Sequence, residues 1–424
     1  MQTPPFMLDE QTAGAIANDF QTPVFVYDEA RIIQTAQELL SFPHHYGLTV
    51  RFAMKANPNK NILRLLHNQG IHIDASSSYE AVRALDAGIP WQNILLTAQE
   101  MAHNLEELIQ AGVQFNACSL HQLEQYGQSY PNSKISIRLN PWLGSWESNR
   151  VNVWWPSSAF GIWHKHIDQV HTICKKYNLT IVRVHSHIGC GTNPDVRENV
   201  AFINIQTLQH FPDATTLNLW WGFKVWRMSH EKTADIHTIW QRIADKIKDF
   251  EQKTGRKIHV EIEPWTYTMA NNWILLCHIQ DITSTGSEGY SFVKLNTGMT
   301  EITRPCMYGS QHPIVFFPQN QTQQNSRQQS QEYLVAWHCC ESWDMLTTMP
   351  WDPEWLRPRS FPTLSVWDIC AIWWAGAYCA SMSLKHYNSF PEAPEVLIRT
   401  DGTITIIRKR QELKDIWENE CDVT

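Results

Sequence analysis

The most regular pattern along the chain is an alternation of short apolar runs with amphipathic segments, which begins near residue 48. Eight of the runs have the length and composition of β-strands, and most intervals between them repeat apolar residues with a helical period. These runs cover residues 48–55, 71–76, 93–98, 114–118, 134–140, 180–188, 215–219 and 257–263. Eight β/α repeats predict an α/β fold with a (β/α)8 barrel of the TIM type, and a doubly wound parallel sheet is the alternative.

The pattern changes after about residue 280. Apolar runs such as YSFVKLN and YLVAWHCC are typical of β-structure, and VLIRT and TITIIR flank the pair Asp401-Gly402. An Asp-Gly pair between two such runs predicts a hairpin with a type I′ turn. The run at 22–28 predicts one further strand, which we expect to join the C-terminal β-structure.

These patterns predict two domains. The barrel should cover residues 30–280, and residues 1–29 with 281–424 should form a β-barrel or β-sandwich domain. A chain of 424 residues is long enough for two cores, and its content of 43% hydrophobic and 18% charged residues is typical of a folded globular protein.

Charge and cysteine content exclude several classes of function. The net charge of −8 disfavours a nucleic-acid-binding surface, and no stretch has the length and apolarity of a membrane span. The first residues lack a basic segment followed by an apolar run, so we expect a cytoplasmic protein without a signal peptide. The ten cysteines show no metal-like spacing, which predicts free thiols and no metal site.

Polar residues stand at the ends of several predicted barrel strands. Lys55 ends the first strand, Asp74 is near the end of the second, His187 is at the sixth and Glu263 ends the eighth. Functional side chains of (β/α)8 barrels lie at the carboxyl ends of the strands, so these residues are expected on one rim. A lysine beside apolar residues can become an amine nucleophile because desolvation disfavours its charged form. A solvated lysine at a strand end is the simpler alternative for Lys55 alone.

Longer motifs in the sequence resemble those of a known family, the fold type III decarboxylases that depend on pyridoxal 5′-phosphate (PLP). This family includes ornithine, diaminopimelate and arginine decarboxylases, and the resemblance extends from about Thr22 to the C-terminus. It implies an alanine-racemase-like fold, PLP as cofactor and a lyase activity. The motifs are AMKAN (53–57), HSHIGCGT (185–192), EIEP (261–264), NTGMTEITRPCMYGSQHPI (296–314), CCES (339–342) and GAYCASMSLKHYNSFPEAPEVL (376–397).

The resemblance implies a role for each residue on the barrel rim. Lys55 corresponds to the lysine that binds PLP covalently, and Glu263 to the carboxylate facing the pyridine nitrogen. His187 corresponds to a catalytic histidine that stacks on the cofactor ring, with Asp74 close to it. Gly222 belongs to a glycine-rich loop whose backbone N–H groups approach phosphate.

The resemblance also implies that the C-terminal domain completes the site and that two subunits share each site in a homodimer. Arg304 and Tyr308 correspond to contacts of the substrate carboxylate, and a guanidinium suits that role. Cys340 corresponds to a catalytic proton donor and Glu341 to a contact of the distal amine, both from the partner subunit. Tyr378 corresponds to a phosphate contact.

The motifs CCES, RPCMY and YNS…PEVL favour meso-2,6-diaminopimelate as the amino-acid substrate. The expected reaction is its decarboxylation to L-lysine, the last step of lysine biosynthesis. Carboxynorspermidine, ornithine or arginine decarboxylation is the alternative within the family. A non-catalytic homologue is the alternative from another class.

Tryptophan is unusually abundant in this chain. The sequence has 20 tryptophans and only 18 glycines, and many of these tryptophans stand where the family motifs have glycine. Trp220, Trp221, Trp265 and Trp343 would crowd a cofactor site. We interpret most of these positions as glycine in the natural protein. If the gene uses UGA for glycine, a translation that reads UGA as tryptophan places tryptophan at each of these codons. A diverged homologue that has lost the cofactor is the alternative.

Overall fold

A computed structural model describes residues 8–140, 158–191, 194–223, 225–228, 231, 235–319 and 329–423. The chain divides into two compact units. One comprises Ile32–Trp226 with Lys232–Thr268, and the other comprises Met1–Arg31, Arg227–Glu231 and Met269–Thr424. Among the helices of the described segments, none is both long enough and apolar enough to cross a membrane.

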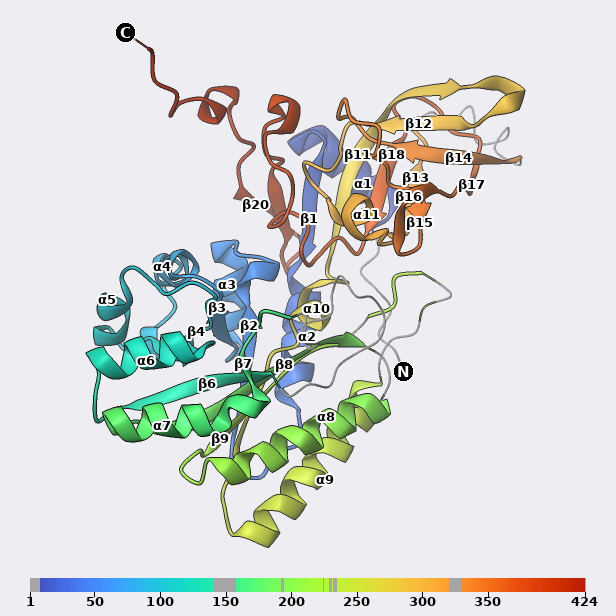
Figure 1. The fold of residues 1–424 in the computed structure, drawn as a ribbon. Helices are drawn as coiled ribbons and strands as arrows, with labels where there is room; N and C mark the ends of the chain where they lie inside the picture. The colour runs from blue at the N-terminus through green and yellow to red at the C-terminus, as the bar shows by residue number, and fades with distance from the viewer. Residues whose placement is uncertain are drawn as a thin grey trace. The chain divides into compact units, whose positions relative to one another are not determined.

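The first unit contains a closed barrel of eight parallel strands, coloured from blue to yellow-green in Figure 1. Neighbouring strands pair in chain order, β10 pairs with β2, and the pairing of β5 with β6 completes the ring. This closure confirms the predicted barrel and excludes the doubly wound sheet. The strands are β2 (Leu48–Ala53), β3 (His72–Ala75), β4 (Ile94–Leu96), β5 (Gln114–Ala117), β6 (Lys134–Asn140), β8 (Thr180–Gly191), β9 (Thr216–Phe223) and β10 (His259–Ile262), with β7 (Ile162–Trp163) beside β6.

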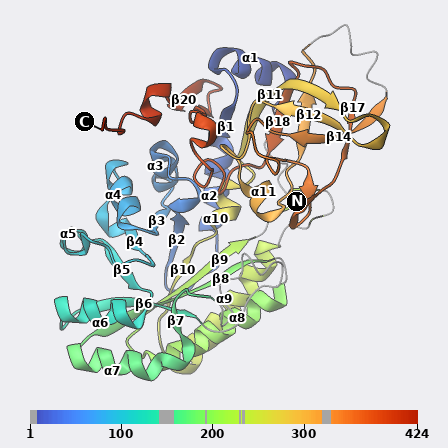
Figure 2. The ribbon, with the colours of Figure 1, turned by 45° about the horizontal axis from the view of Figure 1, so that its top comes forward.

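Helices cover the outer side of the strands, as Figure 2 shows for α6, α7, α8 and α9. Serines mark two helix starts: the hydroxyls of Ser77 and Ser119 accept backbone N–H bonds at the first turns of α4 and α6. The helices are α2 (Glu29–Leu40), α3 (Lys60–Asn68), α4 (Ser78–Asp86), α5 (Leu105–Gln110), α6 (Leu120–Ser129), α7 (Ile167–Tyr177), α8 (Pro194–Thr207), α9 (Ile236–Thr254) and α10 (Trp265–Met269), with short 3-10 turns η1 (Met54–Ala56), η2 (Trp91–Asn93), η4 (His164–His166) and η5 (Leu208–His210).

Charged and polar side chains fill part of the barrel interior. Glu261 on β10 forms ion pairs with Arg51 at 3.0 Å and Arg183 at 2.9 Å. Burial alone would raise the pKa of Glu261, but the two guanidinium groups outweigh burial and hold this pKa below its usual value. Gln114 accepts from both arginines, so the buried charges are paired and hydrogen-bonded.

The second unit is built on a nine-stranded sheet, which confirms the predicted β-domain. The strand at 22–28 is present as β1, which lies between β11 and β19. The elements are α1 (Glu10–Phe20), β1 (Val24–Asp28), β11 (Trp273–Ser284), η6 (Gly286–Glu288), β12 (Ser291–Leu295), α11 (Arg304–Tyr308), β13 (Ile314–Phe317), β14 (Ser330–Ala336), β15 (Thr348–Met349), β16 (Asp352–Leu356), β17 (Arg359–Pro362), β18 (Ile369–Trp373), η8 (Tyr387–Ser389), β19 (Glu395–Ile398), β20 (Ile404–Arg408) and η9 (Leu413–Ile416).

The predicted hairpin exists, but its turn is not of type I′. Strands β19 and β20 pair antiparallel, and the N–H of Gly402 donates to the carbonyl of Arg399 at 2.9 Å. Gly402 has φ 84°, whereas Asp401 is not among the residues with positive φ, and a type I′ turn requires positive φ at both. Asp401 accepts from the backbone and hydroxyl of Thr403, which holds its carboxylate in a local loop instead.

Candidate active site

Four polar residues predicted at strand ends lie on the barrel at its carboxyl rim. Lys55 lies in η1 directly after β2, Asp74 is in β3, His187 is in β8, and Glu263 follows β10. The parallel register pairs Ala53 with Asp74, so the ends of β2 and β3 are level. The pKa of Lys55 responds to the charges of both Asp74 and Glu263, which indicates that the three groups are close.

Lys55 has the electrostatic environment of a potential amine nucleophile. Burial lowers its pKa most, and the positive charge of Arg138 lowers it further. The negative charges of Asp74, Glu80 and Glu263 oppose this shift without cancelling it. A lowered pKa increases the fraction of neutral amine, which is the form that attacks a carbonyl carbon.

Asp74 is fully buried and is held by a hydroxyl. The Oγ1 atom of Thr97 donates to Oδ1 of Asp74 at 2.7 Å, and the amide of Asn116 donates to the same hydroxyl at 3.4 Å. Burial raises the pKa of Asp74 to about 7, although the bond from Thr97 and the charge of Lys55 oppose the shift. This carboxyl can therefore gain or lose a proton near neutral pH.

Glu263 is also fully buried and is held by an amide. Nδ2 of Asn218 donates to Oε1 of Glu263 at 2.7 Å. Burial and the nearby charge of Asp74 raise the pKa of Glu263 well above its ordinary value. His185 lies 4.0 Å from the same carboxyl, but burial lowers the pKa of His185, so the imidazole is neutral at neutral pH.

The imidazole of His187 is oriented by a guanidinium. NH2 of Arg138, on β6, lies 3.2 Å from Nδ1 of His187. Because a guanidinium can only donate, Nδ1 must carry the lone pair and the ring proton must be on Nε2. The arrangement selects one neutral tautomer of His187 and directs its N–H away from Arg138.

The indole of Trp265 lies next to two of these rim residues. Its ring centre is 5.1 Å from that of His187, edge to face, and 5.9 Å from Nζ of Lys55. The side chain is only 3% exposed. The crowding predicted for Trp265 is therefore present next to Lys55 and His187.

Gly222 lies near the end of β9, where its backbone pairs with Cys190 of β8. The side chains of Trp220 and Trp221 are outside the part of the chain that the structure describes. The predicted phosphate loop therefore lies at the end of a barrel strand, as the fold allows.

The other predicted site residues lie in the second unit. Arg304 and Tyr308 are at the two ends of α11, where the guanidinium lies 5.8 Å from the phenol ring centre. Cys340 is exposed, and its N–H donates to Oδ1 of Asn388 at 2.9 Å. Glu341 accepts from the hydroxyl of Tyr387 at 3.3 Å.

Two further predictions concern this unit. Tyr378 follows β18 and has φ 60°. Trp343 is 46% exposed, so its side chain is not part of the core.

Several residues of the rim were not predicted. Arg138, Thr97 and Asn218 orient the predicted residues, and each lies in or next to an otherwise apolar strand. Their polar side chains within apolar strands could have marked these residues in the sequence. That pattern does not show which side chain each of them contacts.

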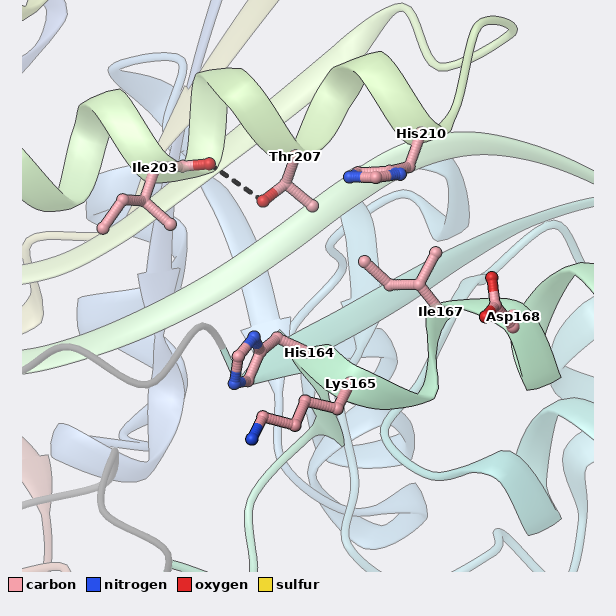
Figure 3. A pocket seen from close by; sticks show the side chains of 7 residues that line it. All are labelled: His164, Lys165, Ile167, Asp168, Ile203, Thr207 and His210. Carbon is pink, nitrogen blue, oxygen red and sulfur yellow. Dashed lines mark hydrogen bonds between the residues drawn. The ribbon is translucent and has the colours of Figure 1, made fainter.

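A separate hollow of about 310 Å³ lies on the outer side of the barrel, between η4 with α7 and α8 with η5. Figure 3 shows the hydroxyl of Thr207 donating to the carbonyl of Ile203 on one wall, with His164 and Lys165 on the other. None of the rim residues lines this hollow, so it is distinct from the candidate site.

Comparisons with known proteins agree with this arrangement. Residues 30–270 match the family described as "Pyridoxal-dependent decarboxylase, pyridoxal binding domain". The diaminopimelate decarboxylase of Buchnera aphidicola subsp. Acyrthosiphon pisum is 31% identical over 408 residues, which are 95% of this chain and 94% of the relative. The enzyme of the same name from Escherichia coli K12 is 30% identical, with 94% and 93% covered.

Solved structures give the same result. A crystal structure of diaminopimelate decarboxylase matches with a TM-score of 0.88 and 29% identity, covering 99% of this chain and 98% of that one. The Helicobacter pylori enzyme complexed with L-lysine matches with a TM-score of 0.81 and 25% identity, covering 96% and 98%. The family match spans more than half of the chain, and the chain therefore belongs to the pyridoxal-dependent decarboxylases.

Proposed function

We propose that this protein is a PLP-dependent carboxy-lyase that converts meso-2,6-diaminopimelate to L-lysine and CO2, the last step of lysine biosynthesis. The observation that carries the proposal is the convergence of a lysine of lowered pKa with two buried carboxyl groups at the carboxyl rim of the barrel. Relatives named diaminopimelate decarboxylase over nearly the full length of the chain support this substrate.

The polar residues of the rim fit PLP. Oδ2 of Asp74 and Oε2 of Glu263 are buried and have no hydrogen-bond partner among the described residues. Buried polar atoms in native proteins normally have a partner, so these two oxygens indicate a polar ligand. A ring nitrogen that faces Glu263 would give one of these oxygens a partner, and an aldehyde would react with the Lys55 amine.

When bound, PLP would supply an electron sink for the carbon that loses CO2. Lys55 would hold the cofactor covalently, and Glu263 would hold a proton toward the ring nitrogen, since its raised pKa favours the protonated carboxyl. His187 would contact the ring in the tautomer that Arg138 selects. Gly222 would offer backbone N–H groups to the phosphate.

The second unit would bind the substrate. Arg304 and Tyr308 would contact a substrate carboxylate, and Glu341 would pair with the distal amine. Cys340 would donate its thiol proton to the carbon after the C–C bond to CO2 breaks. Its exposure in the chain makes the thiol available for this role. Tyr378 would contact the phosphate.

We propose that the domain of residues 30–280 binds the cofactor. The domain of residues 1–29 and 281–424 would contribute the remaining residues of the active site. Two such chains would form a homodimer in which Cys340 and Glu341 act on the partner's cofactor. The protein would act in the cytoplasm on a free amino acid, without a nucleic-acid or membrane partner.

The test of the proposal is a CO2-release assay with meso-diaminopimelate, carboxynorspermidine, ornithine and arginine. Diaminopimelate should be decarboxylated fastest. Faster CO2 release from carboxynorspermidine, ornithine or arginine would contradict the assignment. Borohydride reduction followed by peptide mapping should place PLP on Lys55. The Lys55→Ala protein should bind no PLP covalently, whereas Lys60→Ala, at the exposed start of α3, should retain it.

A further inference from the structure

Three tryptophans in the second unit have the backbone conformation of glycine. Trp351, Trp367 and Trp374 have φ of 63°, 74° and 60°. Positive φ is uncommon for residues with a Cβ, and for a bulky side chain it is an outlier. Asparagine tolerates this region because of its short polar side chain. The other positive-φ residues with a side chain are Gln21, Asn132, Asn178, Tyr378, His386, Asn388 and Ser389.

Backbone hydrogen bonds stabilise this conformation at two of the positions. The N–H of Trp367 donates to the carbonyl of Ile279 at 2.8 Å, and that of Trp351 donates to the carbonyl of Gly309 at 3.0 Å. Both bonds would form equally well with any residue that tolerates positive φ. These bonds accompany a backbone path on which both residues have positive φ.

The indoles at these two positions gain little from burial. The side chain of Trp367 is 61% exposed and that of Trp351 is 42% exposed. A large apolar side chain stabilises a fold mainly by leaving water, so these two indoles offset little of the backbone cost. Glycine would adopt the same φ without that cost.

The fourth relevant position is in the barrel. The indole of Trp265 lies near both Lys55 and His187, where it would compete with a ligand of the two residues. The composition agrees with a common origin, because tryptophan exceeds glycine in number, whereas glycine normally makes up about 7% of a protein.

We propose that Trp351, Trp367, Trp374 and Trp265 stand where the protein made in its own cell has glycine, because UGA codons of this gene specify glycine. Glycine at 265 removes the indole that lies beside Lys55 and His187 and leaves more room for PLP. This last step rests on the proposed function. The three positions in the second unit do not depend on it.

The proposal does not extend to every tryptophan. Trp240 lies in α9, is fully buried, and packs against Phe42 and Phe223 with ring centres 5.3 and 6.0 Å away. Trp163 has φ −62°. Trp240 has the environment of a genuine tryptophan and Trp163 lacks the positive φ of the three positions in the second unit, so we expect UGG codons at 163 and 240. Trp265 also lacks positive φ, so its inclusion rests on its place beside Lys55 and His187.

Mass spectrometry of peptides from the protein isolated from its native cells tests the codon assignment directly. We expect glycine at 265, 351, 367 and 374 and tryptophan at 163 and 240. Tryptophan at 351, 367 and 374 would overturn the proposal, and tryptophan at 265 alone would overturn its extension to the cofactor site.

Recombinant variants of the chain as printed provide a second test. Trp351→Gly and Trp367→Gly should each raise the midpoint of thermal unfolding by roughly 2–4 °C, because they relieve a left-handed backbone. Trp240→Gly, the control for a genuine tryptophan, should lower it by at least as much. Unchanged or lower midpoints for both position-351 and position-367 variants would contradict the backbone argument.

Cofactor binding separates this inference from the proposed function. Titration of Trp265→Gly with PLP, followed by absorbance, should show binding at least tenfold tighter than for the unsubstituted chain. If native peptides carry glycine at 265 but the protein isolated from its native cells neither holds nor binds PLP, the codon assignment stands and the proposed function fails. If the unsubstituted chain binds PLP as tightly as the variant, Trp265 does not obstruct the site.

Discussion

Asn218 donates from Nδ2 to Oε1 of Glu263 over 2.7 Å, inside the barrel and out of contact with water. The same amide group lies 3.1 Å from Oε2 of Glu261, which is paired with Arg51 and Arg183. One neutral side chain thus connects the carboxyl group at the rim with the ionic groups of the interior. The position of Glu263 depends on the packing of the whole barrel.

Replacing Asn218 should therefore affect both stability and cofactor binding. Asn218→Ala leaves an oxygen of Glu263 without its donor, which should lower the free energy of unfolding by about 1–3 kcal/mol. PLP binding should also weaken, measured by titration on the folded variant. Gln241→Ala removes an exposed amide that donates to Asp245 one turn along α9, and this control should change neither quantity.

The buried ion pair of Arg51 and Glu261 predicts a large loss of stability on substitution. Arg51→Met removes one of the two charges that compensate the buried carboxylate, and such losses cost about 3–5 kcal/mol. Urea denaturation measures the change. Lys294→Met breaks an exposed ion pair with Asp281 and should cost at most about 1 kcal/mol. If both substitutions lowered the free energy of unfolding by the same amount, the interior charges would not be desolvated.

Glu261 also predicts how stability depends on acid. Because its pKa is lower in the folded chain than the ordinary value of 4.5, the unfolded chain binds more protons in acid. Its contribution is complete above about pH 4.5 and is lost as the pH falls toward the folded pKa. Denaturation curves between pH 7 and pH 3 should show this loss in the unsubstituted protein and less of it in Glu261→Gln.

Glu301 predicts the opposite dependence on pH. Burial raises its pKa from 4.5 to about 7, although Thr300, Gly298 and Thr297 donate hydrogen bonds to it. The folded chain then binds more protons than the unfolded chain, so Glu301 makes stability fall as the pH rises from about 4.5 to about 7. Glu301→Gln should remove this decline of up to about 3 kcal/mol. Glu420→Gln, at the exposed C-terminal end, should leave it in place.

The proposed proton donor can be tested by comparing two exposed cysteines. Cys340→Ala should lower turnover roughly 10²-fold or more without changing PLP binding, because it removes a general acid. Cys421→Ala changes the other exposed thiol of the described chain and should leave turnover unchanged. Normal turnover in Cys340→Ala would exclude this cysteine as the donor.

The loop that carries Cys340 offers a related prediction. Asn388 accepts the N–H of Cys340, and Asp344 accepts the N–H of Cys339 at 2.8 Å. Asn388→Ala should lower turnover by a factor of about ten, with PLP affinity unchanged, because the thiol loses its fixed position. Asn388→Asp keeps the acceptor oxygen and should recover most of the activity.

The sequence by itself determined the order and type of the elements. Eight apolar runs matched the eight barrel strands because strand and helix periods are local properties of a segment. The residues with the relevant chemistry, such as Lys55 and Glu263, could also be named from their places at the ends of those runs. The type I′ turn at Asp401-Gly402 was predicted wrongly, because of the two residues only Gly402 has positive φ.

Only the tertiary structure decided which groups act together. Closure through β5 and β6 excluded the doubly wound sheet. Arg138 is 49 residues from His187, and Asn218 is 45 residues from Glu263. Such contacts depend on strand register and barrel closure, which no local pattern encodes. The positive φ of Trp351 and Trp367 likewise accompanies backbone hydrogen bonds to Gly309 and Ile279, which no local pattern encodes.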